Sequence, residues 1–249
     1  MLKGLITAFS MYSKIPMPRI EWSEDSMRYS LCFFPLVGAI IGITLILWGK
    51  VCFLFNIPDL LFCAVCTALP ILISGGIHLD GFIDTSDAFS SYKSREEKLG
   101  ILKDPHVGAF GIICCCVYFI LTFGSFQAAY DMEKLEIIAL CFVLSRALSA
   151  LNISKEKCAK DSGLLFMFSS AAHKRVVAIS SGIYIAVCVG LMYIISEKTA
   201  LCVSAAYLVV EAYYLYKTKK EFGGITGDTA GWLVCVEELV MIAVIALVG

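Results

Sequence analysis

The stretch Leu31–Gly49, LCFFPLVGAIIGITLILWG, contains no charged side chain in 19 residues. A helix of about 20 predominantly apolar residues is long enough to cross the hydrocarbon core of a bilayer. Six further segments approach this length and composition: roughly Phe53–Ser74, Gly108–Phe126, Leu135–Leu151, Val176–Ile195, Ala200–Tyr216 and Trp232–Val248. The sequence therefore predicts an all-α, polytopic integral membrane bundle of about seven transmembrane helices. Because no internal repeat or linker is visible, it also predicts a single domain over residues 1–249.

The composition supports the membrane class. Hydrophobic residues make up 59% of the chain and charged residues only 16%, whereas a soluble domain has about 45–50% and about 25%. The net charge of −1 and the lack of a dense basic stripe argue against a nucleic-acid partner. Most of the 12 cysteines lie in apolar runs, where we expect reduced, small apolar side chains.

The positions of lysine and arginine predict the orientation. Sixteen of the 20 basic residues fall in alternate loops on one side, three fall on the other side, and Arg146 lies inside a span. Loops on the cytoplasmic side carry an excess of lysine and arginine. We therefore expect a multi-pass protein of the bacterial cytoplasmic (inner) membrane, with its N-terminus in the cytoplasm and its C-terminus outside. Three polar stretches rich in glycine and aspartate would then face the cytoplasm.

The first polar stretch is Gly75–Ala88, GGIHLDGFIDTSDA. Its carboxylates Asp80, Asp84 and Asp87 stand at i, i+4 and i+7, so they share one face of a helix. Three like charges on one stripe need a compensating cation, and Mg²⁺ is commonly shared between one or two carboxylates and a substrate phosphate. The three aspartates are therefore candidate metal ligands, with a solvated acidic helix face as the alternative.

The same stretch contains further candidate residues. Gly75, Gly76 and Gly81 permit the close approach of a ligand to the backbone. His78 is a candidate general base or phosphate donor. A packing or capping histidine is the alternative, and a helix that already includes His78 would direct it away from Asp80.

The second polar stretch is GILKDPHVGAFG, which covers residues 100–111. Lys103 is suited to contact a phosphate, and Asp104 is a candidate base or metal ligand. An interfacial loop whose lysine reaches toward water is the alternative.

The third polar stretch, FGGITGDTAG, leads into the last predicted span. Gly223, Gly224 and Gly227 are typical of a loop that offers backbone N–H groups to an anion at a helix N-terminus. Asp228 would supply a fourth carboxylate. The stretch lacks the residue order of a P-loop.

Four ionisable residues lie inside predicted spans: Arg146, Glu211, Glu237 and Glu238. Such residues usually face the bundle interior or a functional cavity. Arg146 is therefore a candidate substrate contact, and an ion pair with a glutamate that only orders the bundle is the alternative.

The three stretches, in this order and spacing, resemble those of the cobalamin synthase family, the membrane-bound adenosylcobinamide-GDP ribazoletransferases. The resemblance covers nearly the whole chain and includes FSMYSKIPMP near the N-terminus and FFPLVGAIIG at Phe33–Gly42. Ser13-Lys14 stands where the family more usually has a Thr-Arg pair. Because the charge is kept, Lys14 is also a candidate substrate-binding residue.

The resemblance implies a Mg²⁺-dependent transferase for substituted phosphate groups in a late step of vitamin B12 biosynthesis. It joins adenosylcobinamide-GDP to α-ribazole (or its 5′-phosphate) and releases GMP. In that reaction Asp80, Asp84 and Asp87 would hold a Mg²⁺–diphosphate group. Asp228, also a candidate metal ligand, would hold the second part of the nucleotide or phosphate with the neighbouring glycines.

Lys103 would neutralise the phosphoryl oxygens, and His78 or Asp104 would take the hydroxyl proton. The implied partners are the two substrates and the lipid bilayer, with other enzymes of the same pathway or a second copy of the chain as further candidates.

Three other classes of membrane protein are alternatives to this family. The D-G-x-x-A-R pattern of CDP-alcohol phosphotransferases is absent, because Gly81 is followed by Phe82-Ile83-Asp84. The N-D-x-x-D-x-x-x-D pattern of membrane prenyltransferases lacks its asparagine. A corrinoid transporter would place its polar groups at mid-membrane, whereas here the acidic residues gather in loops on one side.

Overall fold

The computed structural model describes residues 1–248, and helices account for most of that range. Within it, the only extended pairing is an isolated bridge between Cys158 and Ile225. The helices are α1 (Leu2–Tyr12), α2 (Glu24–Met27), α3 (Ser30–Phe55), α4 (Asp59–Ser74), α5 (Ile77–Ser90), α6 (Arg95–Ile101), α7 (Ala109–Ala128), α8 (Met132–Lys155), α9 (Leu164–Ala171), α10 (Lys174–Ile195), α11 (Glu197–Glu221) and α12 (Gly227–Val248).

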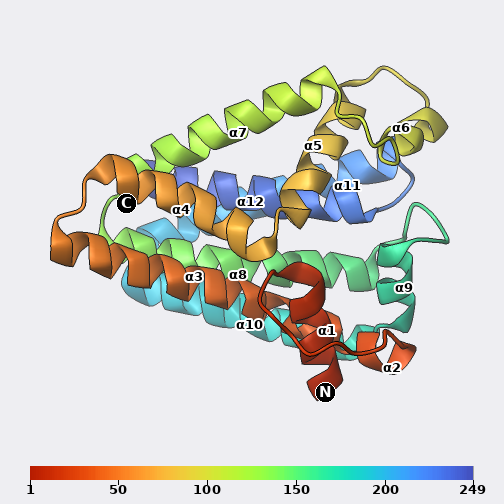
Figure 1. The fold of residues 1–249 in the computed structure, drawn as a ribbon, viewed down its shortest axis with the longest axis horizontal. Coiled ribbons are helices and arrows are strands. Elements are labelled where there is room, and N and C mark those ends of the chain that lie inside the picture. The colour runs from red at the N-terminus through yellow and green to blue at the C-terminus, as the bar shows by residue number, and fades with distance from the viewer. Residues whose placement is uncertain (249) are drawn as a thin grey trace.

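Six helices are long and apolar enough to cross a membrane: α3, α7, α8, α10, α11 and α12. Helices α4 and α5 form a seventh candidate, bent by 96°. Figure 1 shows the long helices running along one common direction, with α1, α2, α6 and α9 gathered at one end. The C-terminal end of α12 lies at the opposite end of the bundle. The predicted all-α, multi-pass membrane bundle is confirmed.

The predicted span Phe53–Ser74 is wrong at its start. Phe53 still belongs to α3, and the chain turns at Asn56, which adopts a left-handed conformation with φ of 50°. Pro58 then precedes α4, where its missing N–H costs no helical hydrogen bond. The apolar helix in this region is therefore α4, which has 16 residues and joins α5 through the 96° bend.

The polar stretch after α4 forms helix α5, on which Asp80, Asp84 and Asp87 share one face as predicted. Gly75 and Gly76 have φ of +69° and +78°, a left-handed conformation that glycine adopts without a Cβ penalty. After this double turn, α5 runs obliquely to the long helices of the bundle (Figure 1). It packs against α12 and α7. The acidic stretch is thereby placed over the start of α12.

Helix α8 is the central helix of the bundle, with contacts to α3, α10 and α12. Two glycines of α3 allow a close approach to it. A Cβ added to Gly38 would collide with the backbone of Phe142, and one added to Gly42 would collide with the backbone and side chain of Ala139. Small residues are favoured at helix interfaces in membranes because dispersion forces between closely packed backbones drive association there.

We expect Gly38→Ala to destabilise the protein by about 1–3 kcal/mol, the usual cost of overpacking. Gly182 in α10 provides the matched control, because a Cβ there meets nothing within 4 Å. In Gly182→Ala the higher helix propensity of alanine is expected to raise stability by about 0.5–1 kcal/mol. Thermal unfolding of both variants in lipid nanodiscs measures the difference, and equal midpoints would contradict the packing account.

The bundle interior contains an ion pair. Arg146 of α8 is 1% exposed and donates to Glu238 of α12, while its Nη1 atom also lies 3.0 Å from the Phe142 carbonyl and the Ser145 hydroxyl. Ser145 Oγ lies 3.1 Å from Glu238 Oε1. Buried charges are tolerated when they are paired and hydrogen-bonded. The structure therefore favours the ion-pair alternative for Arg146.

Candidate active site

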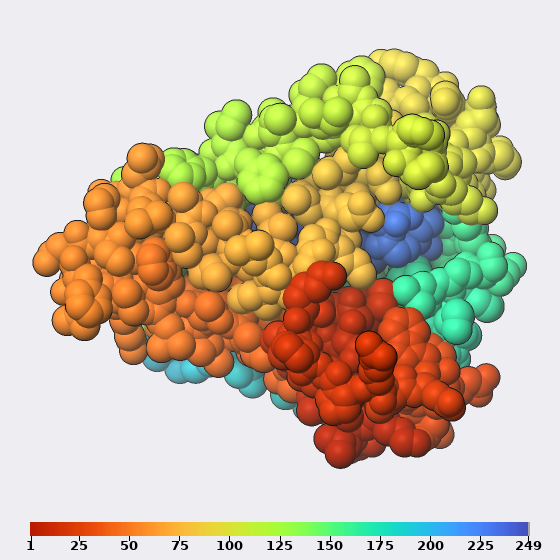
Figure 2. Space-filling model, in the orientation of Figure 1, coloured from red at the N-terminus to blue at the C-terminus, as the bar shows by residue number. Residues whose placement is uncertain are grey.

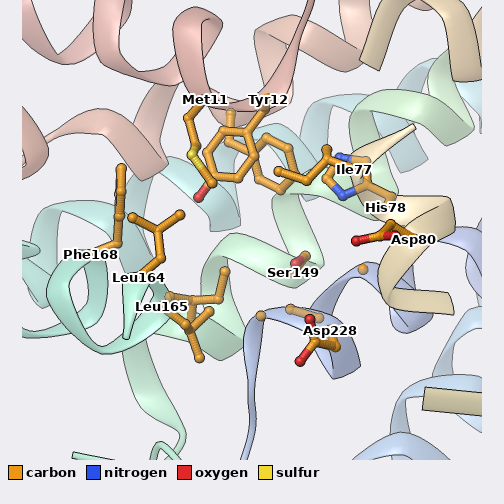
Figure 3. A pocket seen from close by; sticks show the side chains of 15 residues that line it. Met11, Tyr12, Ile77, His78, Asp80, Ser149, Leu164, Leu165, Phe168 and Asp228 are labelled. Atoms are coloured by element: carbon orange, nitrogen blue, oxygen red, sulfur yellow. The ribbon is translucent and has the colours of Figure 1, made fainter. Parts of the chain in front are cut away.

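The polar end of the bundle contains a cavity that we name the aromatic cavity. It has a volume of about 190 Å³ and lies between α1, α3, α5, α8, α9 and α12. Its lining residues are Met11, Tyr12, Phe34, Ile77, His78, Asp80, Ser149, Ile153, Leu164, Leu165, Phe168, Gly227, Asp228, Ala230 and Gly231. Figure 3 shows His78 and Asp80 on one side of this cavity and Leu164, Leu165 and Phe168 on the other.

A second cavity, which we name the lysine cavity, adjoins the first. It has a volume of about 260 Å³ and includes Lys103 and Lys160. The two cavities share the lining residues Leu164, Leu165, Gly227 and Asp228. In Figure 2 the blue surface of the C-terminal part of the chain is visible here, between the N-terminal segment, α5 and the α9 region.

The shared wall is the N-terminus of α12. Thr226 and Thr229 bind each other reciprocally: the Thr226 N–H donates to Thr229 Oγ1 at 2.8 Å, and the Thr229 N–H donates to Thr226 Oγ1 at 3.1 Å. This arrangement fixes the first turn, with Gly227 and Asp228 between the two threonines. The N-terminus of a helix carries a partial positive charge and free N–H groups, so it favours an anion. Together with Lys103 and Lys160, it makes the lysine cavity suited to a phosphate group.

The position of Lys160 depends on backbone pairing with the segment before α12. The Ala159 N–H donates to the Ile225 carbonyl at 2.8 Å, and the Ile225 N–H donates to the Lys157 carbonyl at 2.9 Å. Burial, reinforced by the charge of Lys103, lowers the pKa of Lys160, while Asp228 opposes the shift. Two cations and one carboxylate therefore interact at the lysine cavity.

The aspartates of α5 occupy different surroundings. Asp80 lines the aromatic cavity. The side chain of Asp87 reaches the first turn of α7, where its Oδ1 atom accepts from the Gly111 N–H at 3.3 Å. Asp84 lies between them along the helix, and burial, followed by repulsion from Asp80, Asp228 and Asp87, raises its pKa to about 6. Excess negative charge therefore accumulates around Asp84.

These carboxylates fit a cation that is bound together with a substrate. Among residues 1–248 no group of three His, Cys, Asp or Glu side chains is arranged to hold a metal ion by itself. Mg²⁺ does not need such a group, because it keeps several waters and is bound through one or two carboxylates plus substrate phosphates. Asp80 and Asp228 line one cavity, and the raised pKa of Asp84 shows the uncompensated charge that a cation would neutralise.

His78 lies in the first turn of α5 and still borders the same cavity as Asp80. The residue is 8% exposed, its ring stacks on Tyr12 at 6.2 Å between centroids, and its Nε2 atom has no hydrogen-bond partner within residues 1–248. Burial, followed by the charge of Arg146, lowers the pKa of His78 to about 3. The ring is therefore neutral at physiological pH and has an unpaired nitrogen.

Most of the glycines predicted to contact a ligand lie in turns or at close contacts between segments. Gly75 lies beneath the side chain of Lys14, and Gly81 allows α5 to reach the backbone of Asp228. Gly223 has φ of +78° beside Arg95, and Gly224 faces the backbone at residues 157–159. Of the six predicted glycines, Gly227 alone lines either cavity.

Five other candidates line neither cavity: Lys14, Asp84, Asp87, Asp104 and Arg146. Lys14 is exposed and packs over Gly75. Asp104 is exposed and accepts from the backbone and ring of His106 at 3.0 and 2.8 Å. Arg146 is held by its ion pair. The structure therefore places Lys14, Asp104 and Arg146 away from the lining of both cavities.

The site also contains residues that the sequence did not single out, namely Tyr12, Ser149, Lys160 and Phe168. Lys160 belongs to a charged loop, and no local pattern distinguishes it from Lys155 or Lys157. The other three lie within helices whose periodicity indicates only a buried face.

Carboxylates, lysines and a helix N-terminus at one end of a membrane-type helical bundle are groups suited to a membrane-embedded phosphotransfer enzyme. The chain belongs to the cobalamin-5-phosphate synthase family, whose model matches residues 4–246.

Its relatives match over nearly their whole length. The chain is 47% identical to the adenosylcobinamide-GDP ribazoletransferase of Lachnoclostridium phytofermentans, over 100% of this chain and 95% of the relative. It is 31% identical to that of Clostridium perfringens, over 99% and 98%, and 30% identical to that of Halalkalibacterium halodurans, over 92% and 90%. No solved structure matches the chain.

Proposed function

We propose that this protein joins adenosylcobinamide-GDP to α-ribazole, or to its 5′-phosphate, and releases GMP. The observation that carries the proposal is the meeting of two chemically different cavities at Asp228, within a chain of the cobalamin-5-phosphate synthase family. A free ribose hydroxyl of the ribazole attacks the phosphorus nearer cobinamide. A new P–O bond forms, the bond to GMP breaks, and the hydroxyl proton passes to a base.

The residues supply positions and charges for this exchange. Lys103 and Lys160, with the N-terminus of α12, bind the diphosphate and stabilise the charge that develops on its oxygens. His78 borders the aromatic cavity, so of His78 and Asp104 it is the one placed to accept the proton. Asp104 lies outside both cavities.

Asp80, Asp84 and Asp228 are proposed to hold Mg²⁺ against the diphosphate. When bound there, Mg²⁺ would polarise the phosphoryl oxygens and neutralise the leaving GMP. Asp87 is proposed to support this group from behind, since its carboxylate also caps α7. Burial, followed by repulsion from the neighbouring aspartates, raises the pKa of Asp84, and a cation at this place would offset both effects.

The polar end of the bundle is proposed to face the cytoplasm of a bacterium, in its cytoplasmic membrane. The excess of lysine and arginine in the connections at that end supports this orientation. Fusion of a reporter enzyme to the C-terminus gives an independent check, because the account requires the reporter to lie outside the cytoplasm.

Incubation of the purified protein in nanodiscs with adenosylcobinamide-GDP, α-ribazole and Mg²⁺ tests the activity. We expect GMP and the joined product in equal amounts, and neither when any one component is omitted. Accumulation of corrinoid inside vesicles without GMP would indicate the transporter alternative.

Lys103→Ala and Lys160→Ala are each expected to raise the KM for adenosylcobinamide-GDP. A hydrogen bond to a charged group contributes about 1.5–3 kcal/mol, so the loss corresponds to roughly tenfold or more. Lys93→Ala is the control, because Lys93 is exposed and lines neither cavity. Steady-state kinetics measure the effect, and an unchanged KM in both cavity variants would exclude the lysine cavity as the diphosphate site.

The raised pKa of Asp84 predicts a pH dependence of Mg²⁺ affinity. Below about pH 6 this carboxyl is protonated, and a cation must displace the proton, which weakens apparent affinity by up to about tenfold per pH unit. Without a cation, the folded protein holds this proton more tightly than the unfolded chain. The group therefore contributes stability below its ordinary pKa, and that contribution is lost as the pH rises toward about 6. Mg²⁺ titrations from pH 5 to 7 are expected to show the slope in the native protein and to lose it in Asp84→Asn.

A further inference from the structure

We propose that the aromatic cavity is the subsite for the flat, largely apolar base of the nucleoside acceptor, and that the guanosine moiety of the other substrate lies outside it. The inference rests on the proposed function, because it assigns one of the two substrates to one of the two cavities. The lysine cavity then receives the diphosphate, and the two substrates meet at Asp228.

The size of the cavity limits its occupant. Its volume of about 190 Å³ is below the roughly 300–1,000 Å³ of a pocket that encloses a whole drug-sized ligand. A corrin ring system does not fit, whereas a bicyclic base does. The cavity therefore receives a fragment of a substrate, with the remainder extending toward the lysine cavity.

The apolar side of the cavity is built for a flat ring. Tyr12 lies 4.2 Å from Phe34 and 6.3 Å from Phe168 between ring centroids. Met11, Ile153 and Leu165 complete this side. Aromatic rings stack on bases irrespective of the pattern of base edges, because every base has a π face.

The opposite side of the cavity is polar. In Figure 3, His78, Asp80 and Asp228 lie across the cavity from Leu164, Leu165 and Phe168. The Nε2 atom of His78 is buried and has no partner within the described residues. A nucleoside placed with its base among the aromatic rings directs its ribose toward these polar groups. A free ribose hydroxyl is then placed on the side of His78 and Asp228, where the aromatic cavity meets the lysine cavity.

Guanosine matches this polarity poorly. Guanine carries donors and acceptors along most of its edge, and a buried polar group without a partner loses its hydration. Phe34, Phe168 and Ile153 offer it no side-chain hydrogen-bond partner, and the hydroxyl of Tyr12 is the one polar side-chain group among the rings on this side of the cavity. A benzimidazole-type base carries a single free ring nitrogen and otherwise presents hydrocarbon, so it suits the same surface.

Two variants test the assignment, because they are expected to change the KM for α-ribazole and not the KM for adenosylcobinamide-GDP. Phe168→Leu removes an aromatic face, and Met11→Ala removes hydrocarbon from a half-buried position that carries less risk to folding. Both residues line the aromatic cavity and not the lysine cavity. Each substitution is expected to raise the KM for α-ribazole by roughly 5- to 10-fold, in keeping with stacking and apolar contacts in a binding pocket. The KM for adenosylcobinamide-GDP is expected to stay within about twofold of the native value.

Met167→Ala is the matched control on α9, since Met167 is exposed and lines neither cavity. It is expected to leave both KM values unchanged. An increase in the KM for adenosylcobinamide-GDP alone would place guanosine in the cavity and overturn the inference. Unchanged KM values for both substrates in Phe168→Leu and Met11→Ala would also overturn it.

Equilibrium binding of α-ribazole alone separates this inference from the proposed reaction. The full-length protein in nanodiscs is expected to bind α-ribazole without Mg²⁺ or the second substrate, and Met11→Ala to bind it several-fold more weakly. Binding with this dependence but no GMP release would uphold the subsite and contradict the proposed function. If the native protein releases GMP but binds α-ribazole no more tightly than Met11→Ala does, the proposed function is upheld and the subsite is contradicted.

Discussion

We expect Asp228→Asn to lower the rate of GMP release on the order of 100-fold, the usual effect of removing one group that binds a metal or stabilises developing charge. Asp228 is shared by the aromatic and lysine cavities and lies at the N-terminus of α12. Its carboxylate therefore stands where the diphosphate, a cation and the attacking hydroxyl have to meet. Asparagine keeps the size of the side chain and removes the charge, so the expected loss is in kcat and in Mg²⁺ affinity.

Asp161→Asn is the control for this prediction. Asp161 is exposed on the connection before α9 and lines neither cavity. The rate of GMP release by Asp161→Asn is expected to stay within about twofold of the native rate, as for surface substitutions away from a site. Equal rates for Asp228→Asn and the native protein, measured at saturating Mg²⁺ and at limiting Mg²⁺, would remove Asp228 from the reaction.

We expect Glu238→Ala to be the most destabilising of the substitutions considered. It leaves the buried charge of Arg146 without its partner, and breaking a buried pair in this way costs about 3–5 kcal/mol. For a chain of this size, that corresponds to a fall in the thermal midpoint of roughly 10 °C or more. Thermal unfolding in nanodiscs measures it, with Glu133→Gln at an exposed position of α8 as the control.

The double variant Arg146→Met with Glu238→Met identifies the cause. Replacement of both partners by apolar side chains of similar length removes the uncompensated charge, so most of the lost stability should return. If the double variant is as unstable as Glu238→Ala, loss of packing rather than an unpaired charge explains the effect.

The sequence predicted the bundle because the physics of a bilayer is local. A run such as Leu31–Gly49 reveals a crossing helix without knowledge of its neighbours. The error at Phe53 also has a local cause, because Asn56 and Pro58 end one helix and begin the next within a continuous apolar stretch. The 96° bend between α4 and α5 depends on two consecutive left-handed glycines, and their sequence suggested flexibility without a direction.

The candidate site was predictable only where side chains follow one another on a single helix. The spacing of Asp80, Asp84 and Asp87 predicted one acidic face, which α5 confirms. Asp228 joins them because Gly81 allows α5 to contact α12, a contact between residues far apart in the chain. Lys160 and Phe168 reach the cavities through tertiary contacts that no short motif encodes. The same limitation applies to the glycines, because no short motif encodes the close contacts that Gly75, Gly81 and Gly224 make.

The measurement that tests the central claim most directly is the joint binding of a divalent cation and a diphosphate at Asp228. Mn²⁺ can replace Mg²⁺ as a paramagnetic probe, and its binding is titrated with and without adenosylcobinamide-GDP. The account predicts that adenosylcobinamide-GDP strengthens Mn²⁺ binding by roughly tenfold or more, within the usual range for coupled ligands, and that Asp228→Asn abolishes the gain. Mn²⁺ binding that is independent of the diphosphate, or that is unchanged in Asp228→Asn, would contradict it.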